Sequence, residues 1–221
     1  MSLTICGVDE AGRGPVMGPL VVAGVKIAET DFDKLDSLNL RDSKECTPKR
    51  RDRLAVELKK VCEIKLEIMP ASDIDELRKE KTLNVIEAEL FARVISGLKP
   101  VDKVYADAAD TNEVTFKENI LLNLDFKPEI ISEHKADSIY TIVSAASIIA
   151  KTTRDAEVDK IQAKIGEEIG SGYPADPVTR AFLTNWIKKH KNLPPHTRSS
   201  WKTVKKIIED NKFKIKTLND Y

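Results

Sequence analysis

Four carboxylates in this sequence have the chemistry of metal ligands: Asp9 and Glu10, which are adjacent and follow an apolar run, Asp107, which ends a second apolar run, and Asp137, which precedes a long helical pattern. Carboxylates gathered in one cleft repel one another, and divalent cations relieve that repulsion. All-oxygen ligands suit Mg²⁺ or Mn²⁺, and two such ions about 4 Å apart would clamp the attacking water and the leaving oxygen of a phosphodiester. The carboxylates therefore favour metal-assisted hydrolysis.

Each of these carboxylates also has a structural explanation. An Asp–Glu pair can end a strand in a polar turn, and an aspartate before a helix, such as Asp110 or Asp137, is most often the N-cap. A shared site requires a particular sheet. If the strands that end at Asp9 and Asp107 are neighbours, their carboxylates meet at one sheet position, and Asp137 closes the site from a helix start.

A glycine-rich turn follows the first two carboxylates directly. Gly12 and Gly14 flank Arg13 within the segment DEAGRGP. Glycine has no Cβ, so the main-chain amides of this turn can approach a phosphate or a sugar closely, and the arginine supplies charge-assisted hydrogen bonds. A dinucleotide-binding fingerprint is excluded, because Met17 occupies the position of its third glycine.

A mixed α/β sheet is the scaffold that periodicity and turn residues predict for these groups. The predicted strands cover residues 3–8, 19–27, 63–68, 103–106 and 129–132, and the first two form a central hairpin. Helical patterns cover residues 48–61, 82–98, 113–123, 138–168, 179–190 and 199–212. Glycines and prolines between residues 170 and 177 break the pattern, so we expect a catalytic domain at 1–175 and a helical substrate-binding region at 176–221.

Composition limits the class of protein. The chain has 221 residues, 41% of them hydrophobic, and its 36 basic and 36 acidic side chains cancel, so a nucleic-acid surface requires local segregation of charge. The run from Trp186 to Lys206 supplies such a segment, because it contains seven Lys and Arg residues and no Asp or Glu. Three scattered cysteines and the absence of a long apolar run predict a soluble cytoplasmic protein without a membrane span.

Six motifs occur in the order in which one family carries them: DEAGRGP at 9–15, DSK at 42–44, DAAD at 107–110, HKAD at 134–137, SAASIIAK at 144–151 and GSGYPADP at 170–177. Together they resemble a type 2 ribonuclease H over about residues 3–203. The GSGYP form, with RSSW at 198–201, is similar to the archaeal and eukaryotic catalytic-subunit branch. The resemblance implies a ribonuclease H-like fold, a mixed five-stranded sheet flanked by helices, with a C-terminal helical extension.

The resemblance also implies an activity. It predicts a divalent-metal-dependent endoribonuclease that hydrolyses the RNA strand of RNA–DNA hybrids and single ribonucleotides embedded in duplex DNA, and that leaves 3′-hydroxyl and 5′-phosphate ends. By motif, Asp9, Glu10, Asp107 and Asp137 match the metal-binding catalytic carboxylates, with Asp9 as the bridge between two ions of Mg²⁺ or Mn²⁺.

Substrate residues follow from the same comparison of motifs. Gly12, Arg13 and Gly14 match the loop that meets the ribose 2′-hydroxyl, and Tyr173 matches the tyrosine that stacks under the sugar at the RNA-to-DNA junction. The 2′-hydroxyl is the group that distinguishes RNA from DNA at a given sugar. A packed loop aromatic is the alternative explanation of Tyr173.

Four further side chains are predicted to contact the substrate, namely Lys44, Ser144, Lys151 and Arg198. For the lysines the alternative is a solvated side chain, for Ser144 it is close packing, and for Arg198 it is anchoring of the C-terminal segment. The basic run at 186–206 is expected to bind duplex phosphates without reading sequence.

Partners and competing functions complete the prediction. The protein is expected to be a monomer, and position alone makes Lys212–Tyr221 the candidate segment for contact with a replication clamp, a frayed end being the alternative. Two other functional classes compete with the nuclease: a nucleic-acid-binding protein that performs no hydrolysis, and a glycoside hydrolase that uses paired carboxylates without a metal.

Overall fold

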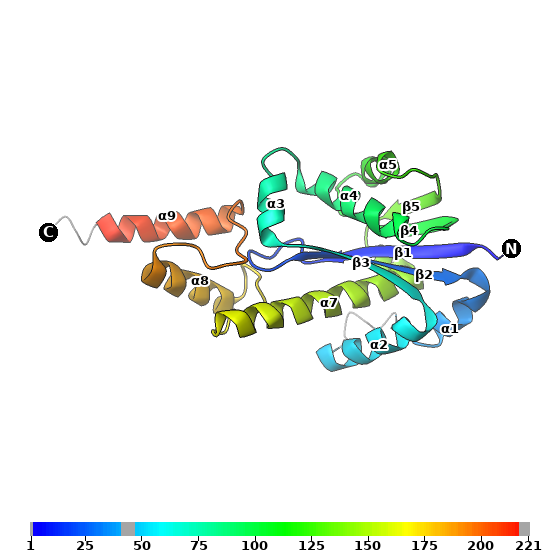
Figure 1. Cartoon of the computed structure of the whole chain (residues 1–221), viewed down its shortest axis with the longest axis horizontal. Coiled ribbons are helices and arrows are strands. Elements are labelled where there is room, and N and C mark those ends of the chain that lie inside the picture. Colours follow the sequence, from blue (N-terminus) through cyan, green and yellow to red (C-terminus); the bar gives the residue numbers. More distant parts are fainter. Residues whose placement is uncertain (1, 41–46, 217–221) are drawn as a thin grey trace. The chain divides into compact units, whose positions relative to one another are not determined.

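The computed structural model of the chain describes residues 2–40 and 47–216, with side chains as far as Asn211 (Figure 1). The chain forms two compact units that interleave along the sequence. The first unit contains Met1–Ala11, Val21–Ile68 and Lys81–Thr153, and the second contains Gly12–Leu20, Met69–Glu80 and Arg154–Tyr221. The functional division at residue 175 stays a prediction.

Five strands form one mixed sheet: β1 (Thr4–Ala11), β2 (Leu20–Ala28), β3 (Glu63–Met69), β4 (Lys103–Asp107) and β5 (Glu129–Glu133). Their order is β3-β2-β1-β4-β5. β1 runs antiparallel to β2 and parallel to β4, and β4 runs parallel to β5. The predicted hairpin and the predicted mixed five-stranded sheet are confirmed.

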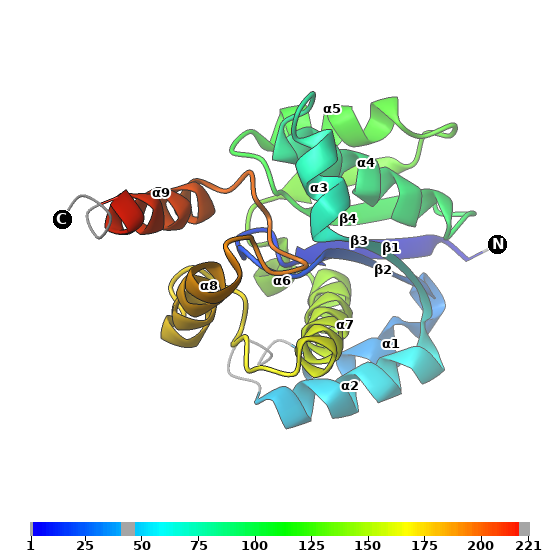
Figure 2. The same ribbon diagram turned by 60° about the vertical axis from the view of Figure 1, so that its left-hand side comes forward.

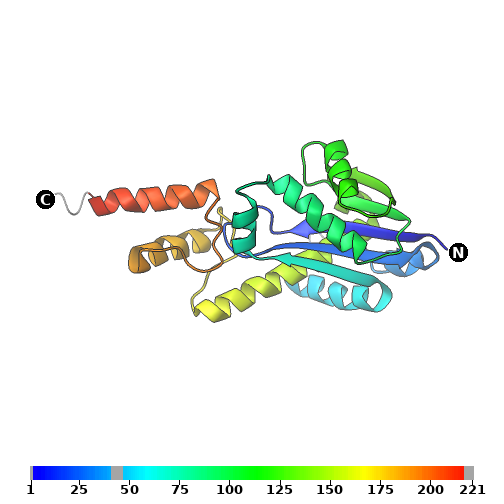
Figure 3. The same cartoon turned by 45° about the horizontal axis from the view of Figure 1, so that its top comes forward.

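Helices cover both faces of the sheet in the first unit. α4 (Leu83–Ser96) and α5 (Glu113–Leu122) lie on one face, and α1 (Phe32–Asp36) and α2 (Pro48–Val61) lie on the other, together with the first half of α7 (Thr141–Ile165) (Figures 2 and 3). A core of buried side chains from β1, β2, α2 and α7 fills the second of these interfaces. Burial of this apolar surface is the main force that holds the layers together.

Two glycines allow helices to pack directly on the central strands. A Cβ on Gly7 of β1 would overlap the main chain of Ile142 at the start of α7. On the neighbouring strand, a Cβ on Gly24 would overlap the side chain of Val94 in α4. The hairpin of β1 and β2 is therefore packed against the start of α7 at Gly7 and against α4 at Gly24.

The predicted single helix from Ser138 to about Glu168 was wrong at its start. The chain forms a short helix, α6 (Ala136–Ile139), and begins α7 only after Tyr140, which has extended backbone at φ −111° and ψ 120°. The Tyr140 ring lies 4.3 Å from that of Tyr105, and its hydroxyl donates a hydrogen bond to Glu133 (3.1 Å). These contacts hold Tyr140 on the sheet and interrupt the helix.

The sequence patterns did not predict the 3₁₀ turn Glu29–Asp31, α1, or α3 (Ala71–Leu77). Helices of five or seven residues complete too few turns to show a 3.6-residue period. The longer helices begin where capping residues stand: the Thr47 side chain accepts the Arg50 amide at the start of α2, and the Asn112 side chain accepts two amides at the start of α5.

The second unit is mainly helical. It contains α3, the second half of α7, α8 (Pro177–His190) and α9 (Lys202–Lys216). In its core, Met17 of the segment Gly12–Leu20 packs with Ile161 of α7, Phe182 of α8 and Val204 of α9. No helix within the described residues is both long and apolar enough to cross a membrane.

Asp176, the N-cap of α8, yields a test of stability. Its carboxylate accepts hydrogen bonds from the amide and the hydroxyl of Ser171 (2.7 and 2.6 Å) and from the Val178 amide (2.9 Å), which lowers its pKa to about 2. Asp176→Ala should lower the melting temperature by about 2–4 °C at neutral pH.

The pH dependence of that loss follows from the direction of the shift. A carboxylate whose pKa is lower in the folded protein stabilises it above the unfolded pKa, and this contribution disappears as the pH falls through about 2. The difference in melting temperature between wild type and variant should therefore be constant above pH ~5 and shrink towards pH ~2. Thermal unfolding followed by circular dichroism checks this, and a difference that does not change with pH would contradict it.

Candidate active site

The first unit places Asp9 and Asp107 on neighbouring strands. Val8 of β1 is paired in register with Ala106 of β4, so the next residue on each strand is one of these aspartates. The condition on which the predicted shared site depended, that the two strands are neighbours, is therefore met. Asp9 is 4% exposed. Burial is the largest cause of the strong increase in its pKa, and the charges of Glu10 and Asp107 raise it further.

Asp137 lies in the first turn of α6, beside Asp107. The main-chain amide of Ala136 donates to the Asp107 carboxylate (3.0 Å), which couples the helix start to the end of β4. Burial raises the pKa of Asp107, hydrogen bonds from the Ala136 and Lys135 amides lower it, and the charge of Asp137 raises it. All four predicted carboxylates thus interact electrostatically as one group, from Glu10 through Asp9 and Asp107 to Asp137.

A line of polar side chains on α7 leads to Asp9. Lys151 donates a hydrogen bond to the Ser147 hydroxyl (2.8 Å), and Ser147, which is buried, donates to the Asp9 carboxylate. Ser144, one turn earlier, is also buried, and its hydroxyl donates to the main-chain carbonyl of Asp137. Its burial favours a supporting role over the direct substrate contact that was predicted.

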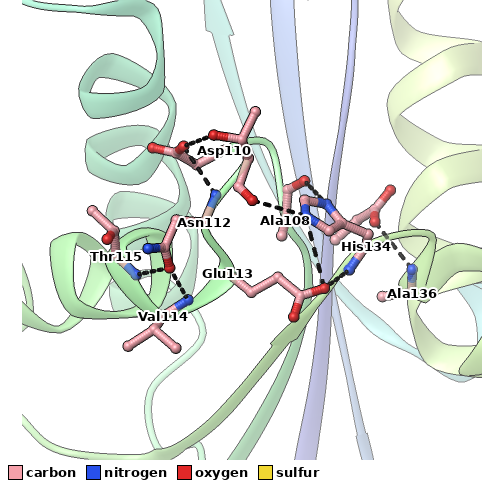
Figure 4. A network of polar contacts seen from close by, with 10 residues as sticks. Ala108, Asp110, Asn112, Glu113, Val114, Thr115, His134 and Ala136 are labelled. Carbon is pink, nitrogen blue, oxygen red and sulfur yellow. Dashed lines mark hydrogen bonds and ion pairs between the residues drawn. The ribbon is translucent and has the colours of Figure 1, made fainter.

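Directly after Asp107 in the sequence, a network of polar contacts joins the start of α5 to the turn after β5 (Figure 4). Glu113 accepts a hydrogen bond from the His134 amide (2.7 Å). The imidazole of His134 lies between the carbonyls of Ala108 (3.3 Å) and Thr111 (3.4 Å). These contacts fix both chain segments beside the aspartate. Sequence reasoning assigned no role to Glu113, because nothing in the sequence links positions 21 residues apart.

The described residues contain no group of three or more His, Cys, Asp and Glu side chains that is already arranged to hold a metal ion. What the structure does show is a set of oxygen donors under mutual repulsion, with one member buried. Carboxylate oxygens are the ligands that a hard divalent cation prefers, and a bound cation would remove the repulsion.

In the second unit, the predicted turn is tightly built. Gly12 has φ +94°, and a Cβ on it would lie 2.6 Å from the Pro19 carbonyl oxygen and 2.7 Å from the Arg154 side chain. Gly14 is different, because it is exposed and a Cβ on it would lie 3.7 Å from the ring of Tyr173. The fold thus brings together Gly14 and Tyr173, which are 159 residues apart in the sequence.

Tyr173 is exposed over 41% of its surface, and the Arg154 guanidinium lies 5.1 Å from its ring centre. Arg154 is buried and donates to the Ser171 carbonyl (3.0 Å), so it supports the tyrosine from within. Sequence reasoning missed Arg154. The signal available was its place one turn after Lys151 in the same motif-bearing helix.

Arg198 is fully buried, and its guanidinium donates to the main-chain carbonyls of Gly12 and Arg13 in the glycine-rich turn and of Gly18 beyond it. This geometry favours the anchoring alternative over direct contact with substrate. The six lysines of the basic run, by contrast, are all exposed: Lys188, Lys189, Lys191, Lys202, Lys205 and Lys206. Lys44 lies outside the described residues.

Comparisons with known proteins agree with this arrangement. A family model described as Ribonuclease HII matches residues 6–204. The protein named Ribonuclease HII from Methanocella arvoryzae is 49% identical over 208 residues, covering 94% of this chain and 92% of that protein. The crystal structure of the ribonuclease H2 from Pyrococcus horikoshii OT3 superposes with a TM-score of 0.88 at 40% identity, covering 95% of this chain and 99% of that one.

A further structure, described as the PCNA:RNase HII complex from Archaeoglobus fulgidus, matches with a TM-score of 0.84 at 39% identity, over 92% of this chain and 96% of that one. The predicted ribonuclease H-like fold is confirmed, and a glycoside hydrolase or a binding protein without hydrolytic activity is set aside. The chain belongs to the ribonuclease HII family and is a type 2 ribonuclease H, an endonuclease that acts on RNA–DNA hybrids.

Proposed function

We propose that this ribonuclease H requires divalent metal ions, and that it cleaves single ribonucleotides embedded in duplex DNA as well as the RNA strand of hybrids, leaving 3′-hydroxyl and 5′-phosphate ends. The observation that carries the proposal is the burial of Asp9 beside Glu10 and Asp107. A buried carboxylate with like-charged neighbours destabilises the fold unless a cation is present. Such a cost is typical of a site retained for function.

The residues that would hold the metal are Asp9, Glu10, Asp107 and Asp137. Bound Mg²⁺ or Mn²⁺ would supply Lewis-acid activation of water and charge stabilisation at the phosphate. The protein's own task is to fix the ligands. Ser147 and Lys151 hold the Asp9 carboxylate from α7, and the Ala136 amide holds that of Asp107. Since hydrogen-bonded ligands keep their orientation, the group is preorganised for the reaction.

Recognition of the ribonucleotide is assigned to Arg13, Gly14 and Tyr173. Gly14 presents bare main chain beside the exposed tyrosine ring, so a sugar can lie on the ring within hydrogen-bond distance of the turn. Amide donors at this point would bind the 2′-hydroxyl that a deoxyribose lacks. A site built to hydrogen-bond one hydroxyl rejects the analogue without it strongly, because its own polar groups are then left unpaired.

The exposed lysines of the basic run are proposed to bind the phosphates of the duplex. A groove in the second unit of about 450 Å³ is lined by Arg180, Lys202 and Lys206, and also by Asp210. Cations there would raise affinity for any duplex and make it fall steeply with salt. Lys151 is exposed at its position on α7 and is proposed as a further phosphate ligand.

A contact with a replication clamp remains part of the proposal. The match to a structure described as a PCNA:RNase HII complex supports it. The segment assigned to this contact, Lys212–Tyr221, continues α9 to Lys216, and residues 217–221 lie outside the described residues. The monomeric state and the cytoplasmic location likewise stay predictions.

Metal removal provides the direct test. A labelled DNA duplex that carries one ribonucleotide should be cut at the 5′ side of that ribonucleotide in Mg²⁺ or Mn²⁺, and cutting should stop when a chelator is added, because the carboxylates cannot activate water themselves. Denaturing electrophoresis of the products measures both the rate and the position of the cut. Restoration by either metal after removal of the chelator shows that the protein stayed folded.

An all-DNA duplex of the same sequence is the control, and it should remain intact under every condition. Cleavage that persists in chelator would overturn the assignment of the carboxylates as metal ligands. Cleavage of hybrids together with an uncut single-ribonucleotide duplex would instead restrict the protein to long RNA–DNA hybrids and remove the role of Gly14 and Tyr173 at a junction.

A further inference from the structure

We propose that Arg198 is a positioning residue that orients the amide groups of the ribose-reading turn, so that the preference for a ribonucleotide depends on a side chain that does not contact the nucleic acid. This inference rests on the proposed function of the Gly12–Arg13–Gly14 turn. It assigns to Arg198 a role in specificity in place of the predicted direct contact with substrate.

The contacts of the guanidinium carry the proposal. Arg198 Nη2 donates to the Gly12 carbonyl (2.6 Å), Nη1 donates to the Arg13 carbonyl (3.0 Å), and Nε donates to the Gly18 carbonyl (3.1 Å). Two successive carbonyls of the turn, and the carbonyl of Gly18 four residues after it, thus face the same planar group. The side chain is 0% exposed, so no face of it is available to a phosphate in solution.

Because peptide bonds are planar, these contacts also fix the direction of the neighbouring main-chain amides. In a trans peptide, the carbonyl of one residue and the amide of the next point in opposite directions. When the carbonyls of Gly12 and Arg13 face Arg198, the amides of Arg13 and Gly14 must point away from it. Gly14 is the residue exposed beside Tyr173. The guanidinium therefore turns the amides of Arg13 and Gly14 away from itself, and we propose that the sugar lies on the side that these amides face.

The cost of burying this cation indicates that its geometry matters. Burial is the largest cause that lowers the pKa of Arg198, to about 9, and Arg154 nearby lowers it as well. Its hydrogen-bond acceptors are neutral carbonyls, and the ring of Trp201 lies 4.9 Å from the guanidinium carbon. An apolar residue would anchor the segment without this desolvation cost, but it could not fix the direction of three carbonyls.

The loop that carries Arg198 is itself held at several points. Its amide donates to the Val16 carbonyl (2.8 Å), and the Gly18 amide donates to the His196 carbonyl (2.9 Å), so turn and loop pair as a short antiparallel bridge. On the other side, Asp75 of α3 accepts four hydrogen bonds from the amides and hydroxyls of Ser199 and Ser200, at 2.6–3.1 Å.

Arg198→Lys is the informative substitution. A lysine retains the charge and a similar length, but it has a single donor nitrogen. That nitrogen cannot reach the three carbonyls that the planar guanidinium contacts. We measure kcat/KM on a DNA duplex with one ribonucleotide, and the inhibition constant of the matched all-DNA duplex as competitor. The variant should lose about 10- to 100-fold in kcat/KM while the inhibition constant changes by less than about 2-fold, because only the orientation of the turn is altered.

Asp75→Asn provides a second variant, in which Arg198 itself is intact. The amide of asparagine cannot accept hydrogen bonds from all four donors, so the loop that carries Arg198 is held less firmly. We therefore expect kcat/KM on the ribonucleotide duplex to fall by less than in Arg198→Lys, with the inhibition constant of the all-DNA duplex again little changed. Asp73→Asn, at an exposed position of the same helix, should leave both constants unchanged. Should Arg198→Lys fail to fold, judged by thermal unfolding, the Asp75→Asn result decides the matter.

The outcomes separate the inference from the function on which it rests. A wild-type enzyme that does not prefer the ribonucleotide duplex would overturn the proposed function itself. A wild-type preference that persists unchanged in both variants would overturn the positioning role alone. Equal losses in kcat/KM and in affinity for the all-DNA duplex would reduce Arg198 to a purely structural residue, and would also overturn the inference.

Discussion

Asp9→Asn should reduce cleavage of a single-ribonucleotide duplex by at least about 100-fold and, in the same protein, raise the melting temperature in chelator by about 2–4 °C. The first effect follows from the loss of a charged ligand from a set of carboxylates. The second follows from its burial, since a carboxyl whose pKa is raised in the folded protein costs stability when it is ionised at neutral pH. Asparagine has nearly the same shape and removes that charge.

This pair of opposite effects distinguishes a functional residue from a structural one. Cleavage rates in saturating Mg²⁺ and thermal unfolding in chelator are measured on wild type and variant. Asp52→Asn, at an exposed position of α2, is the matched control and should change neither quantity. A variant that loses activity together with several degrees of stability would contradict the prediction, because Asp9 would then act as a structural partner of Ser147.

Gly12→Ala should destabilise the fold by about 2 kcal/mol or more, and activity should fall with it. The backbone at Gly12 has φ +94°, which an L-residue with a Cβ rarely adopts, and the added atom would lie 2.6 Å from the Pro19 carbonyl oxygen. The Arg154 side chain on its other side would have to move as well. Since Arg154 supports Tyr173, the substitution disturbs the turn and the tyrosine together.

Gly14→Ala is the matched variant two residues away. Its Cβ would make an ordinary contact of 3.7 Å with the Tyr173 ring, so the melting temperature should stay close to that of wild type. We expect cleavage of the single-ribonucleotide duplex to fall about 10- to 100-fold, because the methyl group occupies space proposed for the sugar. Denaturant unfolding and cleavage assays on both variants test the contrast. Equal destabilisation by the two substitutions would contradict the predicted difference in stability, and unchanged cleavage by Gly14→Ala would show that the sugar does not lie beside Gly14.

The carboxylates could be proposed from the sequence because they stand in short motifs. Asp9, Glu10 and Asp107 stand at or near strand ends, which periodicity reveals. Asp137 lies in a short helix that the patterns did not predict, and the adjacency of β1 and β4 had to be supplied by the fold. The strands and the longer helices were predictable, since each spans enough residues to show its period.

The supporting residues were not predictable, because their roles arise from contacts between distant segments. Glu113 meets the His134 amide, and Asp75 meets Ser199 and Ser200, through chain reversals that no spacing encodes. Arg198 shows the limit most clearly. A basic residue within a basic run is typical of a phosphate-binding surface, and only burial shows that its donors face the main chain.

The contacts of Arg198 join two segments that a ribosome synthesises at very different times. Arg198 and Gly12 are separated by 186 positions, so the turn that follows β1 is synthesised almost first and acquires its guanidinium partner almost last. A nascent chain that has not yet reached Arg198 already contains every proposed metal ligand and the α7 side chains that support them. Contacts of such long range form late, because the loop they close is costly in entropy. During synthesis, the proposed metal ligands are therefore made before Arg198, the residue proposed to orient the turn that selects the ribonucleotide.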